Sequence, residues 1–128
     1  MILLLDTHLL LWTAGQSEKL PAEAHELFAD RNNDLYFSAA SIWEIAIKNN
    51  LGRDDFKVQP RRLRRGLLEN DWRELAITSE HAAALDQIPP LHKDPFDRLL
   101  IAQAIVEGFT LVTSDESVAK YAGPIRKV

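Results

Sequence analysis

Four acidic side chains in this chain occupy positions from which they could hold a metal ion. Asp6 directly follows the apolar run Ile2–Leu5, and Asp115 follows the segment TLVT. Asp97 lies near the start of a long apolar segment, and Glu44 lies within SAASIWEIAIK. If these carboxylates share one partly buried site, they repel one another, and a hard divalent ion such as Mg²⁺ or Mn²⁺ relieves the repulsion through oxygen ligation. Such a site points to phosphoryl chemistry, because Mg²⁺ commonly binds a few carboxylates together with a substrate phosphate.

Each of these acids, taken singly, also has a structural interpretation. Asp6 and Asp115 could cap helices by accepting hydrogen bonds from first-turn amides, and for either residue the two interpretations balance. Glu44 fits a capping-box spacing from Ser41 and could pair with Lys48 on a solvated helix face. For Glu44 alone the structural interpretation is favoured, and only the convergence of all four acids favours metal binding.

The segment HKDPFDR contains two carboxylates with different expected roles. Asp94 precedes Pro95, which is the strongest helix-capping signal in the chain, so capping is favoured there. Asp97 shares a helix face with Leu100 and Ile101. A carboxylate at the head of an apolar face is costly unless a cation or hydrogen bonds compensate it, so a functional role is favoured for Asp97.

Strands and helices alternate along the chain and must bring these acids together. The patterns predict strands at 2–5, 35–37, within 72–77, at 110–113 and at 125–128, and helices at 7–14, 21–32, 38–50, 60–70, 79–88, 96–107 and 115–121. This alternation indicates an α/β fold, a mainly parallel sheet with helices on both faces. In such a sheet every strand-to-helix turn lies at the carboxyl edge, where ligands usually bind.

Composition narrows the class of protein. With 128 residues, 46% of them hydrophobic, the chain is expected to form a single domain spanning residues 1–128. It has no cysteine, which excludes disulfides and thiolate chemistry. No signal peptide or membrane span is expected, and a cytoplasmic location is predicted. The formal net charge of −4 argues against a general nucleic-acid binder, although RRLRR at 61–65 is a local basic cluster.

Four stretches together resemble one family. LLLDTHLLLW, SAASIWEIAIKNNLG, HKDPFDRLLIAQA and TLVTSD occur in the order found in the PIN domain, and in particular in the VapC-type toxins of bacterial toxin–antitoxin pairs. The resemblance spans almost the whole chain. It implies a three-layer α/β/α sandwich and a metal-dependent endoribonuclease that leaves a 5′-phosphate and a 3′-hydroxyl.

Residue roles follow from the resemblance position by position. It implies that Asp6, Asp97 and Asp115 hold one or two Mg²⁺ or Mn²⁺ ions, and that Glu44 is a further ligand or orients the attacking water. Asp94 matches an additional acidic position of the DPFDR subgroup. Thr7 and Ser114 match the small hydroxyl residues that lie beside the first and last aspartates of the family.

The resemblance implies an RNA substrate, a VapB-like antitoxin partner and a homodimer. Residues 9–12, LLLW, offer more apolar surface than one short helix usually buries, and part of it is expected to form such an interface. The RRLRR helix either contacts RNA phosphates or is a solvated face with Leu63, Leu67 and Leu68 turned inward, and the two interpretations balance. His8 and His92 are expected at the surface or supporting the ligands, and the three tryptophans are expected as core or interface anchors: Trp12, Trp43 and Trp72.

Other functions fit the sequence less well. A haloacid-dehalogenase-type phosphatase has a second aspartate two residues after the first. In this chain the residue two positions after Asp6 is His8. A receiver domain has a pair of acidic residues near its start, which this sequence lacks. A non-catalytic RNA- or partner-binding module remains the alternative from a different class, and the intact set of acids argues against it.

Overall fold

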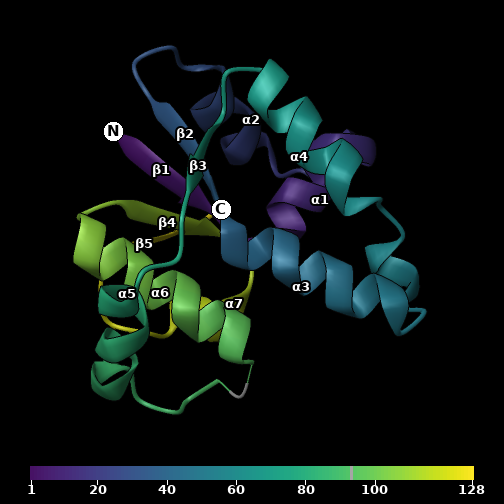
Figure 1. The fold of residues 1–128 in the computed structure, drawn as a ribbon. Coiled ribbons are helices and arrows are strands. Elements are labelled where there is room, and N and C mark those ends of the chain that lie inside the picture. Colours follow the sequence, from purple (N-terminus) through teal and green to yellow (C-terminus); the bar gives the residue numbers. More distant parts are fainter. Residues whose placement is uncertain (93) are drawn as a thin grey trace.

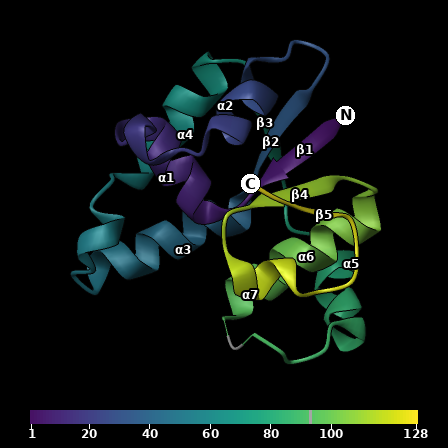
Figure 2. The same ribbon diagram turned by 180° about the vertical axis from the view of Figure 1, so that it is seen from behind.

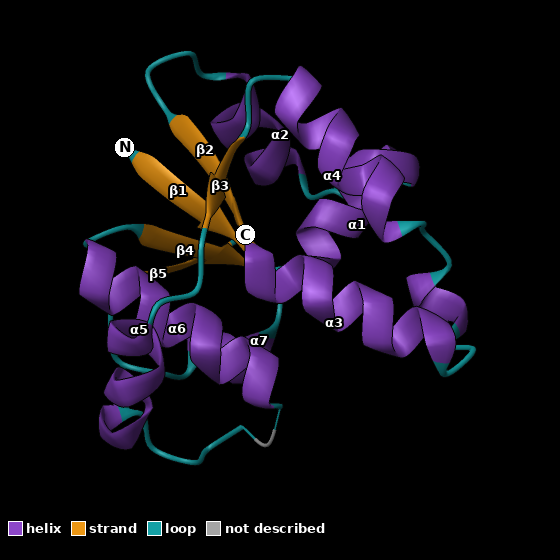
Figure 3. Cartoon of the chain, viewed as in Figure 1, coloured by secondary structure: helices purple, strands orange, loops and turns teal. Residues whose placement is uncertain are grey.

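A computed structural model describes residues 1–92 and 94–128 of the chain. The described residues form a five-stranded sheet in the order β3-β2-β1-β4-β5, and all neighbouring strands pair in parallel (Figure 1, Figure 3). The strands are β1 (Ile2–Leu5), β2 (Asp34–Ser38), β3 (Arg73–Leu75), β4 (Thr110–Thr113) and β5 (Ile125–Lys127). The predicted mainly parallel sheet is confirmed.

Helices connect the strands as the sequence predicts, with shorter bounds in places. They are α1 (Thr7–Gly15), α2 (Ala22–Ala29), α3 (Ala39–Asn50), α4 (Pro60–Glu69), α5 (Ser79–Ala83), α6 (Pro95–Glu107) and α7 (Glu116–Ala119). The second half of the helix predicted at 79–88 is a 3₁₀ turn, Ala84–Gln87, and further 3₁₀ turns lie at Ser17–Lys19 and Asp54–Phe56. No helix among the described residues is long and apolar enough to cross a membrane.

Side-chain alternation along the central strand divides the core in two. Leu3 and Leu5 of β1 pack with α1, α2 and α4 on one face of the sheet, while Leu4 packs with α6 and α7 on the other. Figure 1 and its reverse view, Figure 2, show these helix layers on opposite sides of the strands. Because both faces are covered, β1 is apolar at every position, and the three-layer arrangement predicted from the sequence is confirmed.

The central position of β1 brings distant segments to one edge. β1 pairs with β2 on one side and with β4 on the other, so the carboxyl ends of these three strands lie next to one another. The pairing continues one residue beyond β1, where the amide of Asp6 donates to the carbonyl of Val112 at 3.0 Å. The sheet therefore delivers the starts of α1, α3 and α7 to a common edge.

Two expectations about apolar residues are wrong. Leu9, Leu10 and Leu11 are all buried within this chain, because a helix packed beneath two others buries more of its circumference than a surface helix does. Leu68 is 40% exposed rather than inward. Of the tryptophans predicted as core or interface anchors, Trp72 is buried in the core, whereas Trp43 is 54% exposed, which leaves the interface role as its prediction.

Replacing glycine by alanine should change the free energy of unfolding in opposite directions at two positions. Gly108 ends α6 with φ of 73°, a left-handed conformation that side chains disfavour, so Gly108→Ala should lower the free energy of unfolding by about 1 kcal/mol. Gly66 lies inside α4 with no atom within 4 Å of an added Cβ, so Gly66→Ala should raise it by about 0.5–1 kcal/mol. Urea unfolding of both variants measures the two changes in free energy. Changes of the same sign would contradict the prediction.

Candidate active site

Asp6 is a buried carboxylate fixed by two hydrogen bonds. Its Oδ1 accepts from the amide of Leu9 at 2.9 Å, which makes Asp6 the N-cap of α1, and its Oδ2 accepts from the hydroxyl of Thr113 at 2.5 Å. Burial raises the pKa of Asp6, and these two hydrogen bonds oppose that rise. The negative charge of Asp115 also raises the pKa of Asp6, so these two acids face the same region. Capping and a chemical role are therefore compatible at Asp6.

Glu44 is almost fully buried and is held at both oxygens. The hydroxyl of Thr7 donates to Oε1 at 2.6 Å, and the amine of Lys48 donates to Oε2 at 2.5 Å. The Thr7 hydroxyl has a single hydrogen, so at its 3.0 Å contact with Ser41 it accepts from that side chain. The capping-box interpretation of Glu44 is wrong, because Ser38 caps α3 by accepting from the amide of Ala40.

Asp97 lies where several negative charges meet. Burial is the largest cause that raises its pKa, to about 6, and the nearby charges of Asp94, Glu44 and Asp6 raise it further. His92 opposes the shift: its Nε2 lies 2.7 Å from Oδ2 of Asp97 and donates to it. These influences indicate that the first turn of α6 lies near the start of α1 and the middle of α3.

Asp94 combines two roles. It caps α6 by accepting from the amide of Phe96 at 2.9 Å, as its position before Pro95 predicts. Its other oxygen lies 3.2 Å from the amine of Lys48, which thereby joins Asp94 to Glu44 across two helices.

Asp115 follows β4 and caps the short helix α7. Its Oδ1 accepts from the amides of Ser117 and Val118, and its own amide donates to the hydroxyl of Thr113 at 3.0 Å. Thr113 therefore connects Asp115 to Asp6. Unlike Asp6, Asp115 is exposed, so its carboxylate reaches the site from the solvent side.

The donor set fits a hard divalent ion. Among the described residues, one triad has ligand atoms within 4.8 Å of one another: His92, Asp94 and Asp97. The charges of Asp6 and Glu44 act on Asp97 of this triad, and the charge of Asp115 acts on Asp6, but none of these three acids belongs to the triad. Burial and neighbouring negative charges raise the pKa values of Asp6 and Asp97, and a cation with oxygen ligands stabilises such an arrangement of carboxylates.

Lys48 and Thr113 gain a place at the site that the sequence did not assign, and His92 takes one of the two roles expected of it. Lys48 was expected on a solvated face, yet its side chain is only 18% exposed and contacts two of the acids. The resemblance points to Ser114, but strand alternation turns its neighbour Thr113 toward Asp6. His92 contacts Asp97 directly, while His8 lies 3.5 Å from Asp55 and contacts none of the acids of the site.

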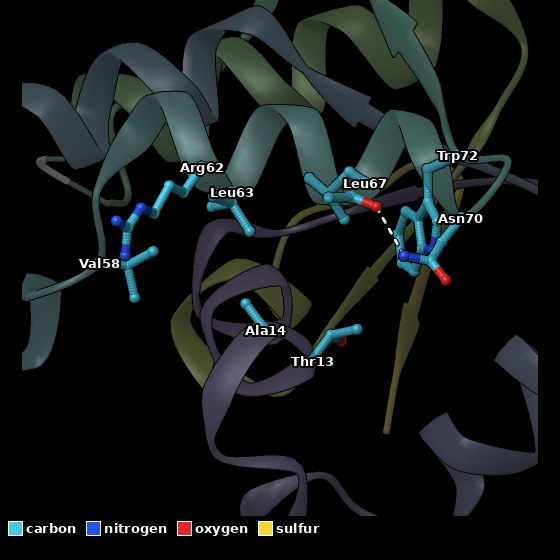
Figure 4. Close-up of a pocket in the computed structure, with 9 residues that line it drawn as sticks. Thr13, Ala14, Val58, Arg62, Leu63, Leu67, Asn70 and Trp72 are labelled. Atoms are coloured by element: carbon cyan, nitrogen blue, oxygen red, sulfur yellow. Dashed lines mark hydrogen bonds between the residues drawn. The ribbon is translucent and has the colours of Figure 1, made fainter.

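The basic helix α4 borders a separate groove. This groove has a volume of about 440 Å³ and lies between α4 and α1 (Figure 4). Its lining includes Leu63, Leu67 and Trp72, with Arg62 at one end and none of the acids of the site. All four arginines of RRLRR are exposed, so an RNA contact there stays a prediction.

The parallel sheet with acids gathered at its carboxyl edge defines an α/β domain of the kind that binds metal ions and phosphates. Comparison with protein families shows which one: the chain matches the PIN domain over residues 3–124 and belongs to that family.

Individual relatives are consistent with this assignment. The chain is 29% identical over 122 residues to Ribonuclease VapC22 of Mycobacterium tuberculosis, covering 94% of this chain and 92% of the relative. The fold is similar to that in VapBC2 from Rickettsia felis bound to a promoter DNA fragment, with a TM-score of 0.70, 15% identity, and 100% and 99% of the two chains covered. It is also similar to VapBC-1 from Haemophilus influenzae, with a TM-score of 0.64, 17% identity, and 99% and 98% covered.

Neutralising Asp97 should stabilise the metal-free protein. Folding raises the pKa of Asp97 from 3.8 to about 6, so the folded protein holds this proton more tightly than the unfolded chain does. The stability that this proton contributes is complete below pH 3.8 and is lost as the pH rises through 6. At pH 7.5 in a chelator, Asp97→Asn should therefore raise the free energy of unfolding by on the order of 2 kcal/mol, and the gain should shrink at pH 4. Urea titrations at both pH values measure this. A loss of stability at pH 7.5 would mean that burial and the neighbouring negative charges do not destabilise the ionised Asp97 carboxylate.

Proposed function

We propose that this protein is a VapC-type endoribonuclease that needs Mg²⁺ or Mn²⁺ and acts as the toxin of a toxin–antitoxin pair. The observation that carries the proposal is the gathering of acids from four segments at the carboxyl edge of the sheet. The likeness to Ribonuclease VapC22 supports RNA as the substrate. The toxin–antitoxin complexes among the structural relatives support a VapB-like antitoxin as the partner.

The residues of the site would have different roles in the reaction. Asp6, Asp97 and Asp115 would hold the metal, with Asp94 at the periphery, and a bound divalent ion supplies a more acidic water and charge neutralisation at the phosphate. Thr113 and the Leu9 amide fix the direction of the Asp6 carboxylate.

His92 fixes Asp97 through one oxygen, and among the described residues no other side chain is hydrogen-bonded to the Asp97 carboxylate. Glu44, held by Thr7 and Lys48, would be a further ligand or would orient the attacking water. Each of its oxygens has a second lone pair available for such a water.

Loss of one acid should abolish RNA cleavage. Purified protein should cut single-stranded RNA with Mg²⁺ or Mn²⁺ and not in a chelator, and Asp6→Asn or Asp97→Asn should reduce the rate at least about 100-fold, since metal sites contribute several kcal/mol to the transition state. The measurement is single-turnover cleavage of labelled RNA.

The matched control is Asp54→Asn. Asp54 is an acid of the same type whose side chain is 91% exposed and pairs with Lys57, so its loss should leave the rate unchanged. Full activity of Asp97→Asn would refute the metal-site assignment. Metal-independent binding of RNA without cleavage would favour the non-catalytic module instead.

The biological role has a separate test. Expression of the protein alone in a bacterium should arrest growth, and Asp97→Asn should not, because a cytoplasmic ribonuclease without its antitoxin would destroy cellular RNA. Growth curves with matched expression levels on immunoblots measure this. Equal growth arrest by both proteins would show toxicity unrelated to this site.

The proposed partners include a second copy of the chain as well as the antitoxin. Trp43 and Ile47 are exposed on one side of α3, and Leu51 follows the helix with 74% exposure. An apolar strip of this kind supports a homodimer.

A further inference from the structure

Lys48 is a largely buried lysine between two of the acids. It lies one turn after Glu44 on α3, and its amine is 2.5 Å from Oε2 of Glu44 and 3.2 Å from Oδ2 of Asp94. The two carboxylates come from different helices, so Lys48 is the cation that bridges α3 and the start of α6. Among the described residues, no other lysine or arginine pairs with the acids of the site.

The surroundings of Lys48 fix the amine in place. The ring of Phe56 has its centroid 4.9 Å from the amine, and that of Phe96 lies 5.8 Å away. Aromatic faces attract an ammonium, and they cover its aliphatic stem at the same time. Lys48 is therefore held by four groups, in contrast to Lys57, which is exposed and pairs with one neighbour on its own turn.

The bridging position of Lys48 is also one that a cation of another kind could occupy. A divalent ion bridging Glu44 and Asp94 would use the same two oxygens at about 2.1 Å, which leaves no room for the ammonium. In two-metal nucleases, two ions about 3.5–4 Å apart stabilise the attacking and leaving oxygens. In this chain the position between Glu44 and Asp94 already contains a positive charge, that of Lys48.

Resting on the proposed nuclease function, we propose that Lys48 takes the place of a second metal ion, so that the site binds a single divalent ion on the side of Asp6 and Asp97. Lys48 is then a positioning residue and a fixed counter-ion. Of the three N–H donors of its ammonium, two serve the carboxylates and one remains for a phosphate oxygen of the RNA. Glu44, with one oxygen bound to Lys48 and one to Thr7, orients the attacking water rather than binding a second ion.

Counting bound Mn²⁺ tests the proposal without reference to activity. Metal-free protein is titrated with Mn²⁺, and the free ion is measured by electron paramagnetic resonance. The parent should bind one ion. Lys48→Met, which keeps an unbranched side chain one atom shorter and removes its charge, should bind two, whereas Lys48→Arg should still bind one.

Two controls locate the second ion. Lys57→Met removes an exposed lysine and should leave the count at one. Adding Asp94→Asn to Lys48→Met removes one of the two bridging carboxylates and should return the count to one. If Lys48→Met fails to fold, as judged by circular dichroism, Lys48→Gln takes its place.

The outcomes separate this inference from the proposed function. Two ions in the parent, or one ion in the folded Lys48 variant, would overturn the role of Lys48, while metal-dependent RNA cleavage by the parent would still stand. No Mn²⁺ bound to the parent would overturn this inference, and the absence of metal-dependent cleavage would independently overturn the proposed function. RNA cleavage measured on the same samples distinguishes these cases.

Discussion

Repulsion among carboxylates at the carboxyl edge of the sheet is the constraint around which this structure is arranged. The negative charges of Asp94, Glu44 and Asp6 add to the effect of burial at Asp97, whose pKa is raised to about 6. A protein that gathers acids in this way needs rigid supports, because each carboxylate would otherwise turn toward solvent. The supports are short hydrogen bonds from groups that the fold fixes in place, such as the Thr113 hydroxyl and the Leu9 amide.

Parallel pairing explains why such supports are available. A parallel sheet places the ends of β1, β2 and β4 side by side, and each of these ends is followed by a helix whose first turn offers free amides. Asp6 and Asp115 each accept from such amides, and Asp94 accepts in the same way at the start of α6, so the capping interpretation and the chemical interpretation describe the same side chains. Helix capping orients the carboxylates, and their remaining lone pairs stay available for a cation.

Charge compensation within the chain has two forms at this site. His92 donates to Asp97, and Lys48 joins Glu44 to Asp94. Removing one member of a buried charged pair usually costs more than the pair itself contributes, because it leaves the other charge uncompensated. The acids, the lysine and the histidine are therefore best considered as one electrostatic unit belonging to a PIN domain, rather than as a list of ligands.

The sequence alone determined the order of the elements, the parallel sheet and which acids end its strands. These features follow from local patterns: apolar runs too short for helices, proline and glycine at helix ends, and carboxylates directly after strands. The tertiary structure decided what local patterns cannot encode. Whether Lys48 faces solvent or two acids depends on where α6 packs against α3, and whether Thr113 or Ser114 meets Asp6 depends on the register between β1 and β4. Likewise, Leu9, Leu10 and Leu11 are all buried because other helices surround α1, a fact set by long-range packing rather than by the pattern of the helix itself.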